Sequence, residues 1–233
     1  DMKVTLFTSN QPRHVSLINR LNEVCDLTAV IETTTSLASG YHSTYTSEVK
    51  AEYFRRVAEA EWTVFPDCNV INAKTIPRRM GDLPDGVPTA DRYIVSGASW
   101  IQGPLCDLLI ENKAINIHMG IAPEYKGSSC NFWAMYDYRP DLVGATVHML
   151  SKGLDSGGIL WKSGSPITPH PFQYTMEAVA MAHRDIVWWV EHGALFDSTP
   201  RPQDKSKEKR YTRASDFTDE ICAEYLNRIN PPT

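Results

Sequence analysis

The sequence has no long apolar run and nothing that would hold it to a membrane. None of its hydrophobic stretches approaches the ~20 residues that a helix needs to cross a bilayer. The chain also opens without the charged, apolar and small-residue regions that make up a signal peptide. We therefore expect no membrane partner and a cytoplasmic location.

Positive charge and paired cysteines are scarce as well. The 23 Lys and Arg residues against 28 Asp and Glu residues give a formal net charge of −5, which is poorly suited to binding nucleic acid through its phosphates. The five cysteines are widely spaced and form no Cys-x-x-Cys pair. This pattern favours free thiols over a disulfide framework or a zinc site. We expect neither a nucleic-acid partner nor a bound metal, and we interpret Cys130 as a small buried residue.

What is present is typical of a folded α/β protein. The length of 233 residues fits one large domain, and six Trp with ten Tyr argue against disorder. Runs of β-forming residues alternate with segments whose apolar residues recur at helical spacing, which favours a mostly parallel sheet. We expect strands at residues 3–8, 27–31, 92–95, 114–118, 144–150 and from 158 onward, and helices at residues 15–24, 48–65, 104–110, 131–138 and 176–193.

Turn-forming residues dominate three other segments. Residues 33–47 and 66–90 are expected to be irregular, and residues 198–210 have the composition of a solvated linker. A last helix is expected near residues 215–228, because its apolar residues recur at helical spacing.

The apolar stripe of that last helix must be covered. A helix of this length is not stable alone in water, so the stripe must pack on its own core or on a second copy of the chain. From the sequence we favour a homodimer. The stripe consists of Phe217, Ile221, Tyr225 and Ile229.

Polar side chains follow three of the expected strands. They are Ser96 to Trp100, then Asn116 with His118, then Ser151 to Asp155. The carboxyl ends of parallel strands meet at one edge of a sheet, so these groups should gather there. Asn116 and His118 project from the same face of their strand, and a carboxylate near His118 would raise its pKa. From the residue types alone, an Asn-x-His sequence is more often an ordinary strand end with satisfied hydrogen bonds than a catalytic pair.

A longer string of motifs changes that interpretation. Asn116-Ile117-His118, Pro123, Tyr125-Lys126-Gly127, Gly144-Ala145-Thr146-Val147-His148 and Gly153-Leu154-Asp155-Ser156-Gly157 follow in order. Together they resemble the formyltransferases that use N10-formyltetrahydrofolate, which transfer its formyl group to an amine. One departure is Met119-Gly120, which stands where the family commonly has Pro-Ser.

The resemblance implies a fold, a co-substrate and a set of site residues. The fold is a Rossmann-like, mostly parallel sheet with helices on both faces, in a catalytic domain at 1–195, followed by a linker and short helical extension at 196–233. The co-substrate is N10-formyltetrahydrofolate, with no metal. Asn116, His118 and Asp155 take the catalytic positions. The folate-binding residues would be Gly97, Ser99, Trp100, Ile101, Ser151, Lys152, Gly153 and Leu154.

Some single residues keep more than one interpretation. Trp100 could stack on the folate ring or be a core aromatic residue. His148 is expected to be a supporting residue whose packing matters more than its chemistry. For His14, His42, His170, His183 and His192 we expect a surface or helix-face role.

The resemblance leaves several acceptors open. Glycinamide ribonucleotide enzymes hold a phosphate on a glycine-containing turn after the first strand, but residues 8–14 contain no glycine. Methionyl-tRNA enzymes add a basic C-terminal domain, and this chain is acidic. We therefore favour the branch that formylates nucleotide-linked amino sugars for polysaccharide biosynthesis, which residues 131–134 and 210–213 resemble. The expected substrate-binding residues are Asn10, Tyr211 and Arg213.

Two further classes stay open. A formyltetrahydrofolate hydrolase uses water as the acceptor but carries an N-terminal regulatory domain, and we expect none here because the first strand begins near Met2. A non-catalytic folate-binding protein would not need Asn116, His118 and Asp155 together, so it ranks last.

Overall fold

The computed structural model describes residues 1–33, 47–66, 69–70, 72–79, 87–153, 155–166 and 170–231. Most of the loop expected at 33–47 lies outside these ranges, and so does Leu154.

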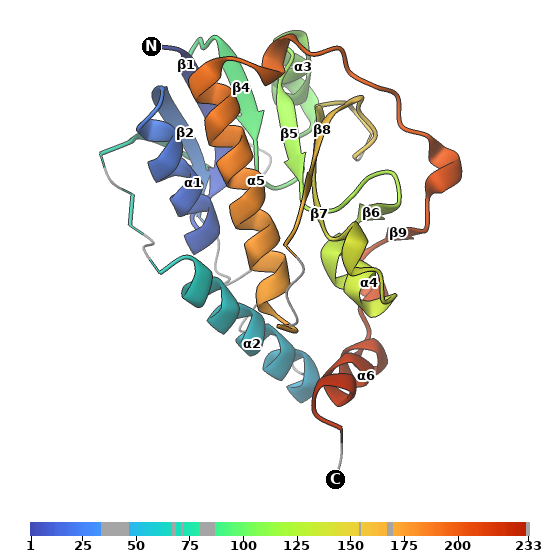
Figure 1. Cartoon of the computed structure of the whole chain (residues 1–233). Coiled ribbons are helices and arrows are strands. Elements are labelled where there is room, and N and C mark those ends of the chain that lie inside the picture. The colour runs from blue at the N-terminus through green and yellow to red at the C-terminus, as the bar shows by residue number, and fades with distance from the viewer. Residues whose placement is uncertain are drawn as a thin grey trace.

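A seven-stranded sheet forms the centre of the fold, in the order β3-β2-β1-β4-β5-β7-β8 (Figure 1). The first five of these strands are parallel, whereas β7 runs antiparallel to β5 and β8 antiparallel to β7. The strands are β1 (Lys3–Ser9), β2 (Asp26–Glu32), β3 (Lys74–Arg78), β4 (Arg92–Val95), β5 (Ile115–His118), β7 (Gly144–Met149) and β8 (Ile159–Gly164). A separate two-stranded parallel sheet pairs β6 (Tyr125–Gly127) with β9 (Arg210–Thr212).

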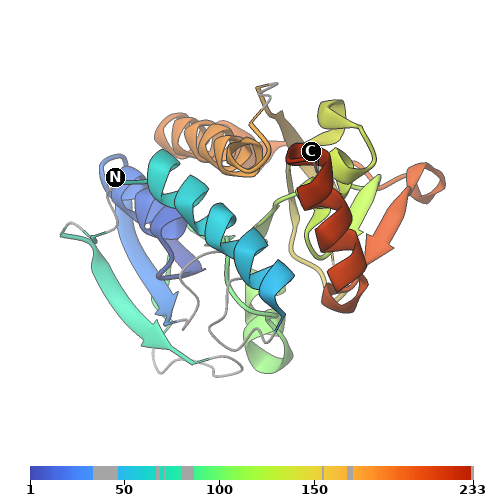
Figure 2. The same cartoon turned by 90° about the horizontal axis from the view of Figure 1, so that it is seen from below.

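Helices cover both faces of the large sheet. Figure 2 shows α1 (Pro12–Asn22) and α5 (Gln173–His192) together on one side of the sheet and α3 (Gly103–Glu111) on the other. The remaining helices, α2 (Glu48–Val64), α4 (Cys130–Tyr136) and α6 (Asp219–Ile229), lie toward the end at which the parallel strands finish (Figure 1). The expected fold class is therefore confirmed.

Local signals in the sequence set several helix ends. Pro12 begins α1, where a missing N–H costs no hydrogen bond. The hydroxyl of Ser47 accepts from the N–H of Lys50 and caps α2, and Thr218 caps α6 in the same way. Gly193 ends α5 with a φ of 66°, in the left-handed region that glycine adopts without strain.

Three apolar clusters hold these layers together. The first lies between the sheet and the α1–α5 layer and includes Leu6, Ile18, Ile94 and Ile186. The second packs α3 against the opposite face. The third joins α2, α4, the start of α5 and the C-terminal segment, and its aromatic members include Tyr53, Phe132, Phe172, Phe217 and Tyr225.

The C-terminal segment therefore packs on its own chain. The ring of Phe217 stands edge-on to that of Phe132 with centroids 4.9 Å apart, and the hydroxyl of Tyr225 donates to the carbonyl of Pro171 at 2.7 Å. Because the stripe on α6 is covered within one chain, it gives no reason to expect a second copy. The homodimer stays a prediction that rests on no contact described here.

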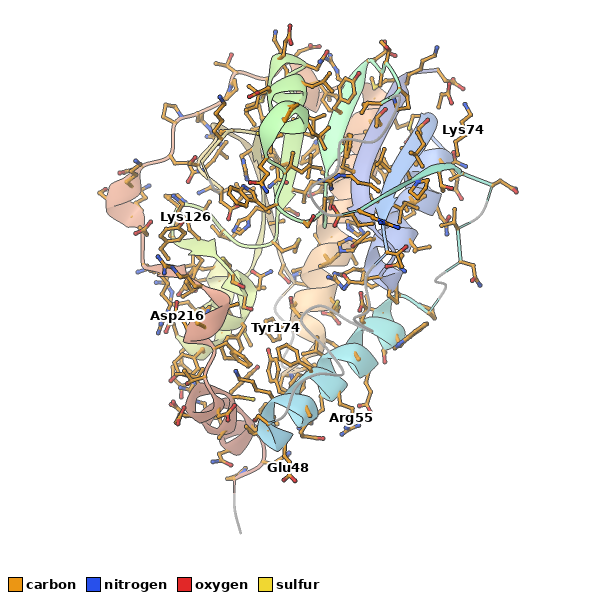
Figure 3. All side chains as sticks on the ribbon, turned by 180° about the vertical axis from the view of Figure 1, so that it is seen from behind. Glu48, Arg55, Lys74, Lys126, Tyr174 and Asp216 are labelled. Carbon is orange, nitrogen blue, oxygen red and sulfur yellow. The ribbon has the colours of Figure 1, made fainter. Side chains whose placement is uncertain are left out.

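The expectation of irregular structure throughout 66–90 was wrong, because Lys74–Arg78 forms the edge strand β3. Figure 3 places Lys74 at this edge, on the opposite side of the molecule from Lys126. Pro77 interrupts the run of β-forming residues, which hid the strand from sequence analysis. An edge strand tolerates proline because one of its sides makes no ladder hydrogen bonds. Among the described helices, none is both long and apolar enough to cross a bilayer.

The third cluster makes a prediction about stability. Replacing Phe217 by Ala removes a buried ring that packs against the rings of Tyr53, Phe54 and Phe132, and should lower the free energy of unfolding by about 3 kcal/mol. Trp62→Ala is the control, because Trp62 on α2 is 45% exposed and should change stability by less than about 0.5 kcal/mol. Urea unfolding measures both variants, and equal effects would mean that the tail does not belong to the core.

Candidate active site

The sheet register brings the predicted catalytic residues together. Val95 at the end of β4 pairs with Asn116 on β5, and Asn116 pairs in turn with His148 on β7. The loops that follow β4 and β7 therefore flank the Asn-x-His strand. A cavity of about 720 Å³ opens at this edge, and Asn116, His118 and Asp155 line it.

His118 and Asp155 form a buried pair. Nδ1 of His118 lies 3.3 Å from Oδ1 of Asp155, and each side chain is less than 10% exposed. Since the carboxylate can only accept, Nδ1–H of His118 is the donor. Nε2 then carries the free lone pair of the ring and lies 3.4 Å from the carbonyl oxygen of Tyr125.

His148 and Asn116 complete the cluster. Nδ1 of His148 lies 2.9 Å from the carbonyl of Met149, to which its N–H donates. This leaves Nε2 to accept from Nδ2 of Asn116 at 3.2 Å. The same Nε2 is 3.7 Å from Asp155 Oδ1. His148 is buried beside Asn116 and holds its amide in place, and its supporting role stays a prediction.

Burial governs the protonation of this cluster. It lowers the pKa of His118 below 6.5, and this effect outweighs the nearby Asp155 carboxylate, which raises that pKa. The Asp155 carboxylate thus acts on the pKa of His118 in the expected direction, but burial sets the net direction. Burial raises the pKa of Asp155, yet the facing rings of His148 and His118 outweigh it and hold that pKa below 3.8. The resting pair at neutral pH is a neutral imidazole beside a carboxylate.

The backbone around Asp155 is held in an unusual conformation. Asp155 has a φ of 50°, in the left-handed region that few non-glycine residues adopt. Nε2 of Gln203, from the segment expected to be a linker, donates to the carbonyls of Asp155 at 2.6 Å and Gly157 at 2.9 Å. A Cβ on Gly157 would lie 1.8 Å from the carbonyl oxygen of Met149, so the turn needs glycine there. The C-terminal segment thus fixes the loop that carries the carboxylate.

The loop after β4 is anchored by a buried ion pair. Glu32 at the end of β2 pairs with Arg78 at the end of β3, and both are buried. The same carboxylate accepts from the N–H of Ser99 at 3.1 Å and from its hydroxyl at 2.7 Å. Gly97 begins this loop with a φ of 74°, and a Cβ there would lie 2.1 Å from His14 Cε1.

Most of the predicted folate-binding residues line the cavity. Gly97, Ser99, Trp100, Ile101, Ser151 and Gly153 do so. Trp100 is 65% exposed, so it is not a core residue and its ring is free to stack. Lys152 is exposed, pairs with Asp107 at 3.4 Å and does not line the cavity. Leu154 lies outside the described residues.

The predicted substrate-binding residues lie outside the cavity wall. Asn10, Tyr211 and Arg213 are exposed and do not line it. Tyr211 has Lys126 Nζ 5.4 Å from its ring centroid, and the N–H of Arg213 donates to Asp216 at 2.7 Å. Figure 3 shows Lys126 and Asp216 on the same side of the molecule. Gly127, Ser128 and Ala214 do line the cavity. Tyr211, which contacts Lys126, and Arg213, which precedes Ala214, therefore lie just outside the cavity wall.

Two histidines for which we expected a surface or helix-face role are in fact buried in the cavity wall. His14 on α1 is 6% exposed and His183 on α5 is 1% exposed, and both line the cavity. The spacing of Val179, His183 and Ile186 places His183 on the apolar face of α5, which was the available signal. For His14 the sequence held no comparable signal.

The packing of Cys130 and His118 around Gly120 explains why glycine stands here in place of the serine that is common in the formyltransferases. Cys130 is buried, as expected, and burial raises the pKa of its thiol. A Cβ on Gly120 would lie 2.5 Å from Cys130 Cβ and 2.8 Å from His118 Nε2. Glycine at position 120 therefore leaves room for both side chains. Among the described residues, no group of three or more His, Cys, Asp or Glu side chains could hold a metal ion.

Comparison with known proteins agrees with this geometry. Residues 101–189, which include Asn116, His118 and Asp155, match the family model described as formyl transferase. A methionyl-tRNA formyltransferase from Synechococcus sp. (strain JA-3-3Ab) is 28% identical over 121 residues. That match covers 51% of this chain and 37% of the relative, so the chain spans well under half the length of that curated protein.

Solved structures resemble the fold over most of the chain. The formyltransferase PseJ from Anoxybacillus kamchatkensis, in complex with UDP-4,6-dideoxy-4-formamido-L-AltNAc and tetrahydrofolate, has a TM-score of 0.55 at 15% identity, covering 98% of this chain and 92% of that one. A 4-N formyltransferase from Francisella tularensis has a TM-score of 0.58 at 14% identity, covering 93% and 78%. A phosphoribosylglycinamide formyltransferase from Anaplasma phagocytophilum has a TM-score of 0.52 at 15% identity, covering 82% and 85%.

Residues 101–189 therefore match the formyl transferase family model, and the chain has the fold that these formyltransferases share.

Proposed function

We propose that this protein transfers the formyl group of N10-formyltetrahydrofolate to the amine of a nucleotide-linked amino sugar. One observation carries the proposal. Asn116, His118 and Asp155 lie on the wall of one cavity, inside the matched formyl transferase domain, with His118 and Asp155 paired at 3.3 Å.

The loops that follow β4 and β7 support a binding site for N10-formyltetrahydrofolate beside the catalytic cluster. Gly97 to Ile101 and the residues around Ser151 and Gly153 line the cavity on either side of Asn116. The exposed indole of Trp100 offers a face for an aromatic ring to stack on. A folate held between these loops would present its formyl group to Asn116 and His118.

The chemistry follows from the protonation states. The amine attacks the formyl carbon, a carbon–nitrogen bond forms, and the carbonyl oxygen becomes an oxyanion. Asn116 uses one N–H on His148 and has a second N–H for that oxyanion.

A proton must then leave the cationic nitrogen. Neutral His118 accepts it at Nε2, where the Asp155 carboxylate on Nδ1 and the carbonyl of Tyr125 stabilise the imidazolium. The proton passes to N10 of the folate as the bond between N10 and the formyl carbon breaks. The products are the formamide and tetrahydrofolate, and no other reactant is needed.

Two features support an amino sugar as the acceptor. The turn before α1 holds no glycine, and Arg13 in the first turn of α1 is already paired with buried Glu61 at 2.6 Å. This cation is therefore not free for a ribonucleotide phosphate.

Formyl transfer assays with different acceptors test the proposal directly. Nucleotide-linked amino sugars, glycinamide ribonucleotide, charged initiator tRNA and water alone are compared with N10-formyltetrahydrofolate as donor. We expect kcat/KM to be highest for an amino sugar. A preference for the ribonucleotide or the tRNA, or turnover that no acceptor accelerates, would contradict the assignment.

The catalytic roles predict a defined pattern of losses. Asn116→Ala, His118→Ala and Asp155→Asn should each lower kcat by about 10² to 10³-fold, because each removes a group that stabilises the transition state. The affinity for tetrahydrofolate should change only a few-fold. Asp141→Asn is the matched control, since this exposed carboxylate pairs only with Arg139 among its described contacts. Near-normal turnover in Asp155→Asn would show that the motif reports the fold alone.

The buried pair also predicts the titration of His118. Its imidazole should titrate below 6.5 because burial disfavours the charged form, so the ring accepts protons at pH 7 and loses this capacity as the pH falls through its pKa. In Asp155→Asn the midpoint should fall further, because the carboxylate that raises the pKa is gone. NMR titration of the ring measures both values, and a midpoint above 6.5 in the unchanged protein would contradict the proton-acceptor role.

A further inference from the structure

The cavity extends beyond the catalytic cluster to a second polar region. His14, His183 and Arg13 line it there, and they come from α1 and α5. These helices lie on the opposite face of the sheet from α3 (Figure 2). Ile101 and Leu150, by contrast, border the two loops proposed for the folate and pack in the cluster under α3. The catalytic residues thus stand between two parts of one cavity.

The two histidines have hydrogen-bonding capacity that the described residues do not use. Nδ1 of His14 and Nδ1 of His183 are both buried, and neither has a hydrogen-bond partner in the described part of the chain. Buried polar atoms without partners are rare in folded proteins and cost stability. Two of them on the wall of one cavity indicate a region shaped for something other than packing.

This region is polar without carrying net charge. Burial is the main reason that the pKa of His14 lies well below 6.5 and that the pKa of His183 is about 3, so both rings are neutral at pH 7. The guanidinium of Arg13 is compensated by the fully buried carboxylate of Glu61. The other cationic side chain of the described wall, Lys50, is partly exposed and lies 4.0 Å from Asp219 Oδ1.

Such a region suits hydroxyl or amide groups. A neutral imidazole offers one donor and one acceptor, which matches a hydroxyl group. A phosphate would need a free cation or several N–H donors, and desolvating it beside neutral rings would be costly. The ring of His14 also packs directly on Gly97, so this region adjoins the loop proposed for the donor.

We propose that His14 and His183 form a subsite for uncharged hydroxyl or amide groups of the acceptor, and that the acceptor's phosphates bind elsewhere. The proposal rests on the proposed function, because it takes the occupant to be the amine acceptor. The acceptor's amine and the donor's formyl group must meet at Asn116 and His118. With the donor between the two loops, the acceptor approaches from the α1–α5 side.

The test uses aromatic variants of the full chain. His14→Phe and His183→Phe replace each imidazole by an aromatic ring that makes no hydrogen bonds. The melting temperature of each variant is measured beside binding, because the phenyl ring is larger than the imidazole and both sites are buried. His192→Phe is the matched control, because His192 lies on α5 outside the cavity. The probe is UDP-linked 4-amino-4,6-dideoxy-N-acetylaltrosamine, compared with UDP alone and with tetrahydrofolate.

We expect each cavity variant to weaken binding of the UDP-amino sugar by about three- to tenfold, the worth of one net hydrogen bond. Binding of UDP alone and of tetrahydrofolate should stay within about twofold, and His192→Phe should change nothing. An equal loss for UDP alone would show that the histidines bind the nucleotide, and unchanged sugar affinity would show that they bind no acceptor group. Either result overturns the subsite.

Failure of the proposed function looks different. In that case the unchanged protein formylates one of the other acceptors and no amino sugar. The variants are then assayed with that acceptor, and an unchanged KM overturns the subsite while a raised KM supports it. If the protein formylates no amine at all, the subsite is overturned together with the proposed function.

Discussion

The rest of the site depends on Asp155, because the negative charge of a carboxylate that is only 9% exposed must be compensated by neighbouring groups. Nδ1–H of His118 donates to it at 3.3 Å and so compensates the charge, while Nε2 of His148 lies 3.7 Å away. The presence of the carboxylate fixes the tautomer of His118 and leaves Nε2 of that ring basic. The backbone contributes as well, since Asp155 holds a left-handed φ that Gln203 secures through the Asp155 carbonyl. Removing the carboxylate would therefore disturb both the orientation and the proton affinity of the base.

The fold assembles this cluster by bringing segments that are distant in the sequence to one edge of the central sheet. Parallel strands β1, β4 and β5 deliver their carboxyl ends side by side, and antiparallel β7 returns His148 to the position next to Asn116. The Glu32–Arg78 pair holds the loop after β4 through Ser99. The C-terminal segment closes the arrangement twice, through Gln203 on the Asp155 turn and through Phe217 in the aromatic cluster. Residues after 195 thus belong to the same physical body as the site that they support.

The sequence predicted those parts of the site that depend on local pattern. Asn116 and His118 share a strand face by period two, and Asp155 follows a third expected strand within a recognisable motif, so both were visible without coordinates. The mostly parallel sheet and the end of α5 at Gly193 were visible for the same reason. Edge strand β3 was not, because Pro77 interrupts its run, and the pairing of β6 with β9 joins segments more than 80 residues apart. The pKa of His118 could not be predicted from its neighbour Asp155, because its direction depends on how deeply the ring is buried.

The central claim is that His118 and Asp155 act as one unit in moving the proton from the attacking amine to N10. Single-turnover transfer rates for His118→Ala, Asp155→Asn and the double variant measure this most directly, by rapid quench with saturating donor and acceptor. If the carboxylate acts through the imidazole, the double variant should be no slower than about the slower of the two single variants. Rate losses that multiply in the double variant would show that the two residues act independently, and would contradict the account.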